Sequence, residues 1–155
     1  MIRKANVKDI PAILGLLKQV LAVHAVGRPD IFKAVGYKYD AGELEKLFTD
    51  RDRIILVYTD DAGEVLAHCF CIVQTQEETP AVYPFRTLYI DDICVREDAR
   101  GRHIGTELYC FVRDYAKEQG FHNVTLHVWE KNPSAMEFYR SLGMQVQQTT
   151  MEEIL

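Results

Sequence analysis

The chain has 155 residues, of which 48% are apolar, and 23 acidic against 18 basic residues give a formal net charge of -5. This size and composition suit a single globular domain over residues 1–155. The acidic balance argues against a broad nucleic-acid-binding face, which needs clustered basic residues. It is compatible with a cationic small-molecule partner.

Compartment and metal content are suggested by what the sequence lacks. No stretch reaches the roughly 18 consecutive apolar residues of a membrane helix, and the N-terminus has no apolar core of a secretory signal. The four cysteines, at positions 69, 71, 94 and 110, have neither redox nor zinc spacing and predict buried reduced thiols. We expect a cytoplasmic protein that holds no metal and contacts no membrane.

The N-terminal third predicts one strand and two helices. Residues 2–5 favour a short strand, and Asn6 can cap a helix whose apolar stripe continues to about Ala25. Residues 26–41 contain glycine and proline and predict a loop. Residues 43–48 predict a short second helix.

The middle of the chain predicts three strands. Residues 53–59 and 65–76 are rich in β-branched and aromatic residues, and the turn sequence at 60–63 joins them into a hairpin. A connection with two prolines at 77–86 leads to a third strand at 87–95.

The last third alternates helices and strands. A turn at 100–105 leads into a helix that ends near Gly120, residues 123–128 predict a half-buried strand, and residues 133–143 predict a helix. Residues 144–155 predict a final extended strand. The resulting order, β-α-α-β-β-β-α-β-α-β, predicts a mixed α/β fold with helices on the faces of a mixed sheet.

The most informative stretch joins the strand at 87–95 to the next helix through a turn with glycine. The first N–H groups of a helix have no intrahelical partner, and the dipole is positive there, so such an end binds phosphates. Gly101 and Gly105 allow a ligand to approach the backbone, while Arg100 and Arg102 supply charge that suits phosphate oxygens. From these residues alone, an ordinary helix start explains the turn equally well.

Residues 95–106 resemble motif A of the GNAT acetyltransferases, whose pattern is Arg/Gln-x-x-Gly-x-Gly/Ala. Arg100 matches the first position and Gly105 the last, whereas His103 replaces the usual glycine. Residues 132–144 resemble motif B, with its asparagine, later tyrosine and terminal glycine, and the beginning of the chain is similar to that of many members. The resemblance covers nearly the whole chain, in family order and spacing.

This resemblance implies the GNAT fold, a central mixed twisted sheet flanked by helices, in which two splayed parallel strands hold acetyl-CoA. The backbone of residues 93–95 would pair with the pantetheine arm, and the N–H groups of residues 101–106 would hold the pyrophosphate. The residues expected to bind the donor are Ile93, Cys94, Val95, Arg100, Gly101, Arg102, His103, Ile104, Gly105, Thr106, Asn132 and Tyr139.

Three residues are expected to be catalytic. Tyr139 matches the family's general acid, which protonates the leaving thiolate. Asp91 and Asp92 are candidates on the acceptor side, where the family's diamine acetyltransferases have a Glu-Asp pair. Neighbouring strand residues point to opposite faces, so we expect only one to face the amine, unless a bulge intervenes. His127 and an ordered water are alternative bases.

The resemblance implies an N-acetyltransferase that moves an acetyl group from acetyl-CoA to a primary amine of a small molecule or polyamine. Residues 24–32 fall where the family builds its variable acceptor wall. Two alternatives remain: acetylation of a peptide or protein N-terminus or lysine, and a non-catalytic CoA-binding sensor. The sequence leaves the acceptor amine, the acyl chain length and the oligomeric state open, a homodimer included.

Overall fold

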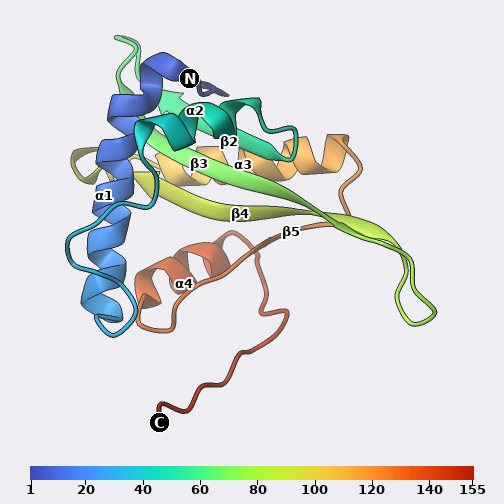
Figure 1. Ribbon diagram of the computed structural model, residues 1–155. Helices are drawn as coiled ribbons and strands as arrows, with labels where there is room; N and C mark the ends of the chain where they lie inside the picture. The colour runs from blue at the N-terminus through green and yellow to red at the C-terminus, as the bar shows by residue number, and fades with distance from the viewer.

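A five-stranded sheet in the order β1-β2-β3-β4-β5 organises the computed structural model, which describes all 155 residues (Figure 1). β1 to β4 pair antiparallel, and β4 pairs with β5 in parallel, which confirms the mixed α/β prediction. The strands are β1 (Ile2–Lys4), β2 (Arg53–Thr59), β3 (Val65–Gln76), β4 (Phe85–Val95) and β5 (Asn123–Leu126). The helices are α1 (Ile10–Gly27), α2 (Ala41–Thr49), α3 (Ile104–Glu118) and α4 (Pro133–Ser141).

Two apolar clusters cover the two faces of this sheet. Along β2, Ile55 and Val57 belong to the cluster with α1 and α2, whereas Leu56 between them belongs to the cluster with α3. This is the two-residue alternation of a strand that is buried on both faces. The long middle strands, β3 and β4, are therefore fixed from both sides. Cys69 and Cys71 point to one face as predicted, with their sulfurs 3.7 Å apart, and all four thiols are free.

α1 is anchored at its start by polar contacts. Asn6 and Asp9 form a reciprocal capping box around a short 3-10 turn, and Asp9 also accepts two hydrogen bonds from Arg3, at 2.7 and 2.8 Å. Asn6 is thus the predicted cap, although the α-helix proper begins at Ile10. These bonds connect β1 to α1.

The same helix is unusually apolar. Together with the preceding turn it spans Val7–Gly27, 21 residues that include an 18-residue window of mean hydropathy 1.6, so it is long and apolar enough to cross a membrane by those measures alone. Its inner face is occupied, however: Ile13, Leu16 and Leu17 are at most 4% exposed within the core. A core helix passes the same test, and the expected lack of membrane contact stays a prediction.

The segment after α4 forms no strand, so the predicted final strand at 144–155 is wrong. Gly143 adopts a φ of 89°, and the amides of Gly143 and Met144 donate to Arg140 and Tyr139 carbonyls at the helix end. β propensity alone makes no strand where no neighbouring backbone offers a hydrogen-bonded ladder. The tail instead extends away from the sheet (Figure 1) and reaches Arg28 through an ion pair with Glu152 at 2.7 Å.

Candidate active site

β4 and β5 separate along their length. They pair from Thr87 with Asn123 to Ile90 with Leu126, where β5 ends two residues earlier than predicted. β4 continues to Val95 without a strand partner on that side. Backbone groups on such an edge are open to hydrogen bonds from another molecule. The expected splayed strands are therefore present.

A cavity of about 510 Å³ opens where the two strands separate. Its wall combines the end of α1, the second half of β4, the start of α3, the segment after β5, and α4. Among the residues predicted for the site, only Arg102 does not line it. The predicted residues that do are Asp91, Asp92, Ile93, Cys94, Val95, Arg100, Gly101, His103, Ile104, Gly105, Thr106, Asn132 and Tyr139.

The turn before α3 has a histidine, His103, where the family motif usually has glycine, and its backbone adopts a conformation typical of glycine. His103 has a φ of 61°, the left-handed conformation in which glycine is the usual residue. That conformation costs most residues roughly 1–2 kcal/mol, although histidine adopts it more readily than most. The backbone therefore follows the path that glycine would allow. The amides of Ile104, Gly105 and Thr106, in the first helical turn, lack intrahelical partners and line the cavity.

Close packing at Gly105 leaves little room for a side chain. A Cβ atom at this position would lie 3.3 Å from Cζ of Phe138 and 3.5 Å from Cγ2 of Val95. Because Gly105 has no side chain, the start of α3 packs closely against both α4 and β4. Arg100 fixes the same corner, because its Nε donates a 3.1 Å hydrogen bond to the Val95 carbonyl.

α4 carries the two motif B residues into the cavity. Asn132 caps this helix, accepting hydrogen bonds through Oδ1 from the Ala135 amide at 3.2 Å and the Ser134 hydroxyl at 3.0 Å. Its amide NH₂ remains free to donate to a ligand. The role of Asn132 in the fold is therefore compatible with a role in binding.

Tyr139 is 9% exposed, and its hydroxyl makes no hydrogen bond within the protein. Burial raises the pKa of Tyr139 well above its usual range, and the nearby negative charge of Asp92 adds to this effect. The phenol therefore stays protonated at neutral pH. Cys94 also lines the cavity, and burial raises its pKa to about 12, so it remains a thiol rather than a nucleophilic thiolate.

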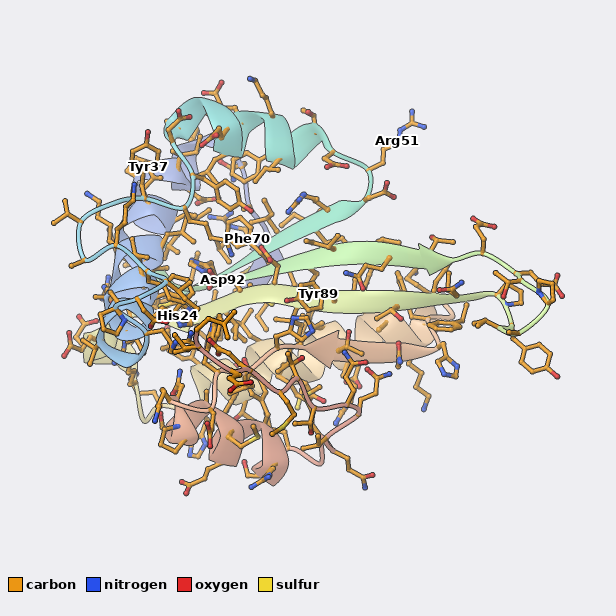
Figure 2. All side chains as sticks on the ribbon, turned by 60° about the horizontal axis from the view of Figure 1, so that its bottom comes forward. His24, Tyr37, Arg51, Phe70, Tyr89 and Asp92 are labelled. Atoms are coloured by element: carbon orange, nitrogen blue, oxygen red, sulfur yellow. The ribbon has the colours of Figure 1, made fainter.

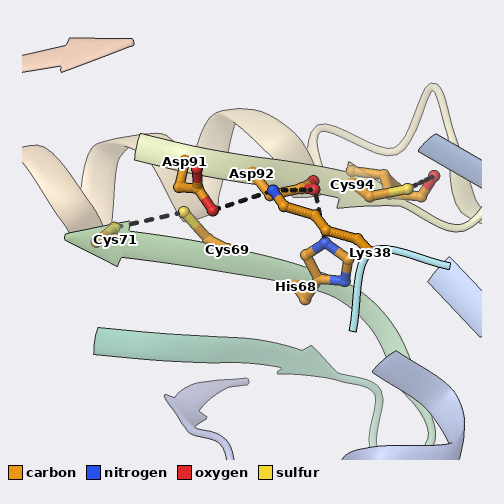
Figure 3. A network of polar contacts seen from close by, with 8 residues as sticks. Lys38, His68, Cys69, Cys71, Asp91, Asp92 and Cys94 are labelled. Atoms are coloured by element: carbon orange, nitrogen blue, oxygen red, sulfur yellow. Dashed lines mark hydrogen bonds and ion pairs between the residues drawn. The ribbon is translucent and has the colours of Figure 1, made fainter. Parts of the chain in front are cut away.

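The two aspartates lie at a β-bulge. Asp92 pairs with Phe70 and Ile90 pairs with Cys71, which leaves Asp91 as the extra residue of β4. As a result, the expectation that neighbouring carboxylates point to opposite faces does not hold. Both bind one ammonium group: Nζ of Lys38 lies 3.0 Å from Asp91 Oδ2 and 3.3 Å from Asp92 Oδ2 (Figure 3).

His68, in the neighbouring strand β3, binds the second carboxylate oxygen of Asp92. Its Nε2 lies 3.2 Å from Asp92 Oδ1, and because a carboxylate only accepts, the proton sits on Nε2. Burial raises the pKa of Asp92, but His68 and Lys38 outweigh burial and hold that pKa below its usual range. For Lys38, burial lowers the pKa and the two aspartates raise it by more. The site therefore holds a charged carboxylate and a charged amine at neutral pH.

Lys38 and His68 were not predicted as site residues. Lys38 comes from the loop between α1 and α2, more than fifty residues from Asp91 in the sequence. His68 lies in a strand whose residues from Val65 to Cys71 are all buried, so no alternation marks it out. Only the three-dimensional structure brings them together.

The rest of the acceptor side is aromatic. His24 stacks on Phe32 at 5.0 Å, Phe32 meets the edge of Trp129 at 5.5 Å, and the guanidinium of Arg28 lies 5.4 Å from the Trp129 ring. Of residues 24–32, expected to form the acceptor wall, His24 lines the cavity, and Phe32 and Arg28 contact Trp129, which also lines it. Burial lowers the pKa of His24, which lies close to Asp92 (Figure 2). His127 is exposed, with Nδ1 3.2 Å from the Tyr89 hydroxyl.

Sequence comparisons find acetyltransferases. The L-methionine sulfoximine/L-methionine sulfone acetyltransferase of Pseudomonas aeruginosa is 28% identical over 149 residues, which cover 94% of this chain and 80% of that protein. The thialysine N-epsilon-acetyltransferase of Bos taurus is 35% identical over 60 residues, or 39% of this chain and 35% of that one.

Structural comparisons agree. A crystal structure of a mutant BH1408 protein from Bacillus halodurans has a TM-score of 0.96 at 30% identity and covers 100% of this chain and 99% of that one. An aminoglycoside acetyltransferase from an uncultured soil sample has the same fold, with a TM-score of 0.74 at 20% identity, covering 100% and 95% of the two chains. The model of the acetyltransferase (GNAT) family matches residues 24–144. This chain therefore belongs to the GNAT family, whose acetyltransferases use acetyl-CoA as the acyl donor.

Proposed function

We propose that this enzyme transfers an acetyl group from acetyl-CoA to the primary amine of a small molecule. One observation carries the proposal: a single cavity joins the phosphate-binding type of helix start to an acidic pair that holds an amine. The names of the Pseudomonas and bovine relatives, which act on small amines, support this class of acceptor.

The donor would lie along the unpaired edge of β4. The backbone of residues 93–95 would pair with the pantetheine arm, and the amides of Ile104, Gly105 and Thr106 would hold the pyrophosphate. Arg100 lies at the same corner and brings a positive charge. The free NH₂ of Asn132 would donate from the opposite wall. Arg102, outside the cavity wall, receives no role.

Tyr139 would act as the general acid. Its raised pKa keeps the phenol protonated at neutral pH, so the hydroxyl can hydrogen-bond to the departing thiolate and supply a proton as the C–S bond breaks. The lack of a protein partner for its hydroxyl leaves that proton free to be donated.

The two aspartates would divide the acceptor work. The Asp91 side chain is 21% exposed, against 4% for Asp92, so Asp91 would face the incoming amine. Asp92, which is itself anchored by His68, would hold the bulge and Lys38 in place. The Asp92 carboxylate, with its lowered pKa, is a weak base, so His127, or an ordered water that relays the proton to solvent, would complete the removal of the amine's proton.

The test is a panel of amines assayed with acetyl-CoA for release of free thiol. Small amino acids, diamines and aminoglycosides form one arm, and peptides with a free N-terminus or a lysine form the other. We expect release with small amines and little with peptides. Peptide-only release would favour the protein-acetylating alternative, and acetyl-CoA binding without any release would favour the sensor.

We further propose that residues 1–155 work as one domain in the cytoplasm, without contact to nucleic acid or membrane. The support is the shared sheet, on which α1, α2, α3 and both core clusters pack, together with the acidic net charge.

A further inference from the structure

The protein holds one of its own primary amines at the proposed acceptor site. Nζ of Lys38 contacts Asp91 and Asp92 at 3.0 and 3.3 Å, and both aspartates line the cavity (Figure 3). An acceptor amine needs the same surroundings: a carboxylate that binds its ammonium form next to the acyl donor. Lys38 therefore occupies the position that a substrate amine would take.

Neighbouring contacts fix Lys38 in this place. Its Nζ lies 5.7 Å from the centre of the Tyr39 ring, and that ring stacks on Phe70 at 6.0 Å. Phe70 is the residue that pairs with Asp92 in the sheet. Asp40 then caps α2 through a reciprocal pair of hydrogen bonds with Glu43 at 2.8 Å. The loop is thus held directly beside the acidic pair.

The groups needed for transfer surround the same point. Asp91 and Asp92 approach from β4, His68 supports Asp92 from β3, and His24 contributes from α1. Tyr139, the proposed acid, lines the same cavity as both aspartates. Amine, carboxylate and acid therefore lie in one neighbourhood, although they come from separate parts of the chain.

We propose that the ε-amino group of Lys38 is itself an acetyl acceptor, so that the enzyme acetylates its own loop. The ammonium of Lys38 first loses a proton to a water molecule beside the acidic pair. Its neutral Nζ then attacks the thioester carbonyl carbon of acetyl-CoA. The new C–N bond replaces the C–S bond, and the nitrogen gives up a second proton to water. The sulfur leaves with its electron pair and takes the proton of Tyr139, which solvent replaces, so the products are Nε-acetyl-lysine and CoA. This step rests on the proposed donor site.

Acetylation has a consequence for the acceptor site. It removes the positive charge that neutralises Asp91 and Asp92, and an amide cannot replace the ammonium in an ion pair. The acidic pair is then open to a cationic substrate. Self-acetylation would convert a closed acceptor site into an open one.

The experiment incubates the full chain with acetyl-CoA and follows each lysine by peptide mass spectrometry. Lys33 is the matched control, because it is an exposed lysine of the same loop without an ion pair. We expect Lys38 to gain an acetyl group at least about tenfold faster than Lys33, as expected for a positioned amine. The rate constant should not depend on protein concentration, and it should rise with pH because the ammonium must first lose a proton.

Two variants sharpen the test. Lys38→Arg keeps the ion pair and cannot be acetylated, so the rapid acetylation of the loop peptide should disappear and only the slow acetylation of Lys33 should remain. Lys38→Gln resembles the acetylated side chain, so it should lower the KM for a cationic amine relative to Lys38→Arg. Equal KM values in the two variants would overturn the proposed opening of the site.

The same preparation is assayed for thiol release with small amines and for thermal stabilisation by acetyl-CoA. Turnover of small amines with Lys38 unmodified, or modified no faster than Lys33, overturns self-acetylation and leaves the proposed function in place. The absence of both turnover and acetyl-CoA binding overturns both proposals.

Discussion

The two ends of the cavity are built in different ways. At the end proposed to bind the donor, here called the donor end, the wall includes the unpaired backbone edge of β4 and the first amides of α3, which Gly105 and Arg100 support within one continuous stretch. At the acceptor end, side chains from distant elements meet: Asp92 lines the cavity, and Lys38 and His68 bind its carboxylate from other parts of the chain. Backbone geometry suits a donor that every family member shares, whereas assembled side chains suit a variable acceptor.

The largest effect is expected from a change to the donor end. Gly105→Glu places a side chain against Phe138 and a negative charge beside the pyrophosphate. Acetyl-CoA at 100 times its Kd should stabilise the native protein by about 2.7 kcal/mol, and this variant should lose that stabilisation in a thermal melt. Gly15→Glu is the control, because Gly15 is an exposed helix residue with open space around it. If acetyl-CoA raised the melting temperature of the Gly105 variant as much as that of the wild type, the donor would have to bind elsewhere.

Removal of one hydroxyl tests the junction between the two ends. Tyr139→Phe should keep the fold and the acetyl-CoA shift while kcat falls by roughly 10²-fold or more, within the range for a positioned acid. Tyr109→Phe is the matched control, since Tyr109 is a buried tyrosine against the Tyr139 ring that does not line the cavity. If kcat stays within a factor of about three of the wild type, water protonates the thiolate.

The acceptor end should respond in KM more than in kcat. Asp91→Asn keeps the shape of the side chain and removes the charge that faces the amine, so the acceptor KM should rise several-fold and the acetyl-CoA shift should persist. Steady-state kinetics with the best amine of the panel measures both constants. Asp98→Asn is the control, an exposed aspartate whose partner is Arg96. An unchanged KM in the Asp91 variant would remove this residue from acceptor binding.

The smallest effect concerns stability at low pH. The pKa of Asp92 is lowered in the folded state, so its contribution to stability is complete above its unfolded pKa and is lost as the pH falls through the folded value. Wild-type melting temperature should therefore drop on acidification below about pH 4. Asp92→Asn should be less stable at neutral pH and show a shallower acid-induced drop. Parallel curves for the two proteins would show that Asp92 does not contribute to the pH dependence.

The sequence predicted the strand, turn and helix of the proposed donor end well because the information for these elements is local. The strand at 87–95, the turn and the helix from Ile104 follow one another without interruption, and short-range rules for strands, turns and helix starts apply to each. His103 looked like a departure from the motif, yet the backbone there takes the conformation that glycine would have.

The acceptor end could not be predicted in the same way. The bulge at Asp91 depends on the register between β3 and β4, and a one-residue shift in register is invisible to patterns within one strand. Lys38 lies in a loop, and nothing in its neighbours indicates contact with β4. The prediction of a final strand at 144–155 was wrong for a related reason, because a strand exists only where a neighbouring strand pairs with it.

The central claim is that donor and acceptor meet in one cavity, and a crystal structure with CoA and the best amine tests it most directly. We expect the pyrophosphate on the amides of Ile104, Gly105 and Thr106, and the amine nitrogen on the carboxylate of Asp91, with Lys38 displaced. CoA bound away from the start of α3, or an amine bound away from the bulge in β4, would contradict the claim.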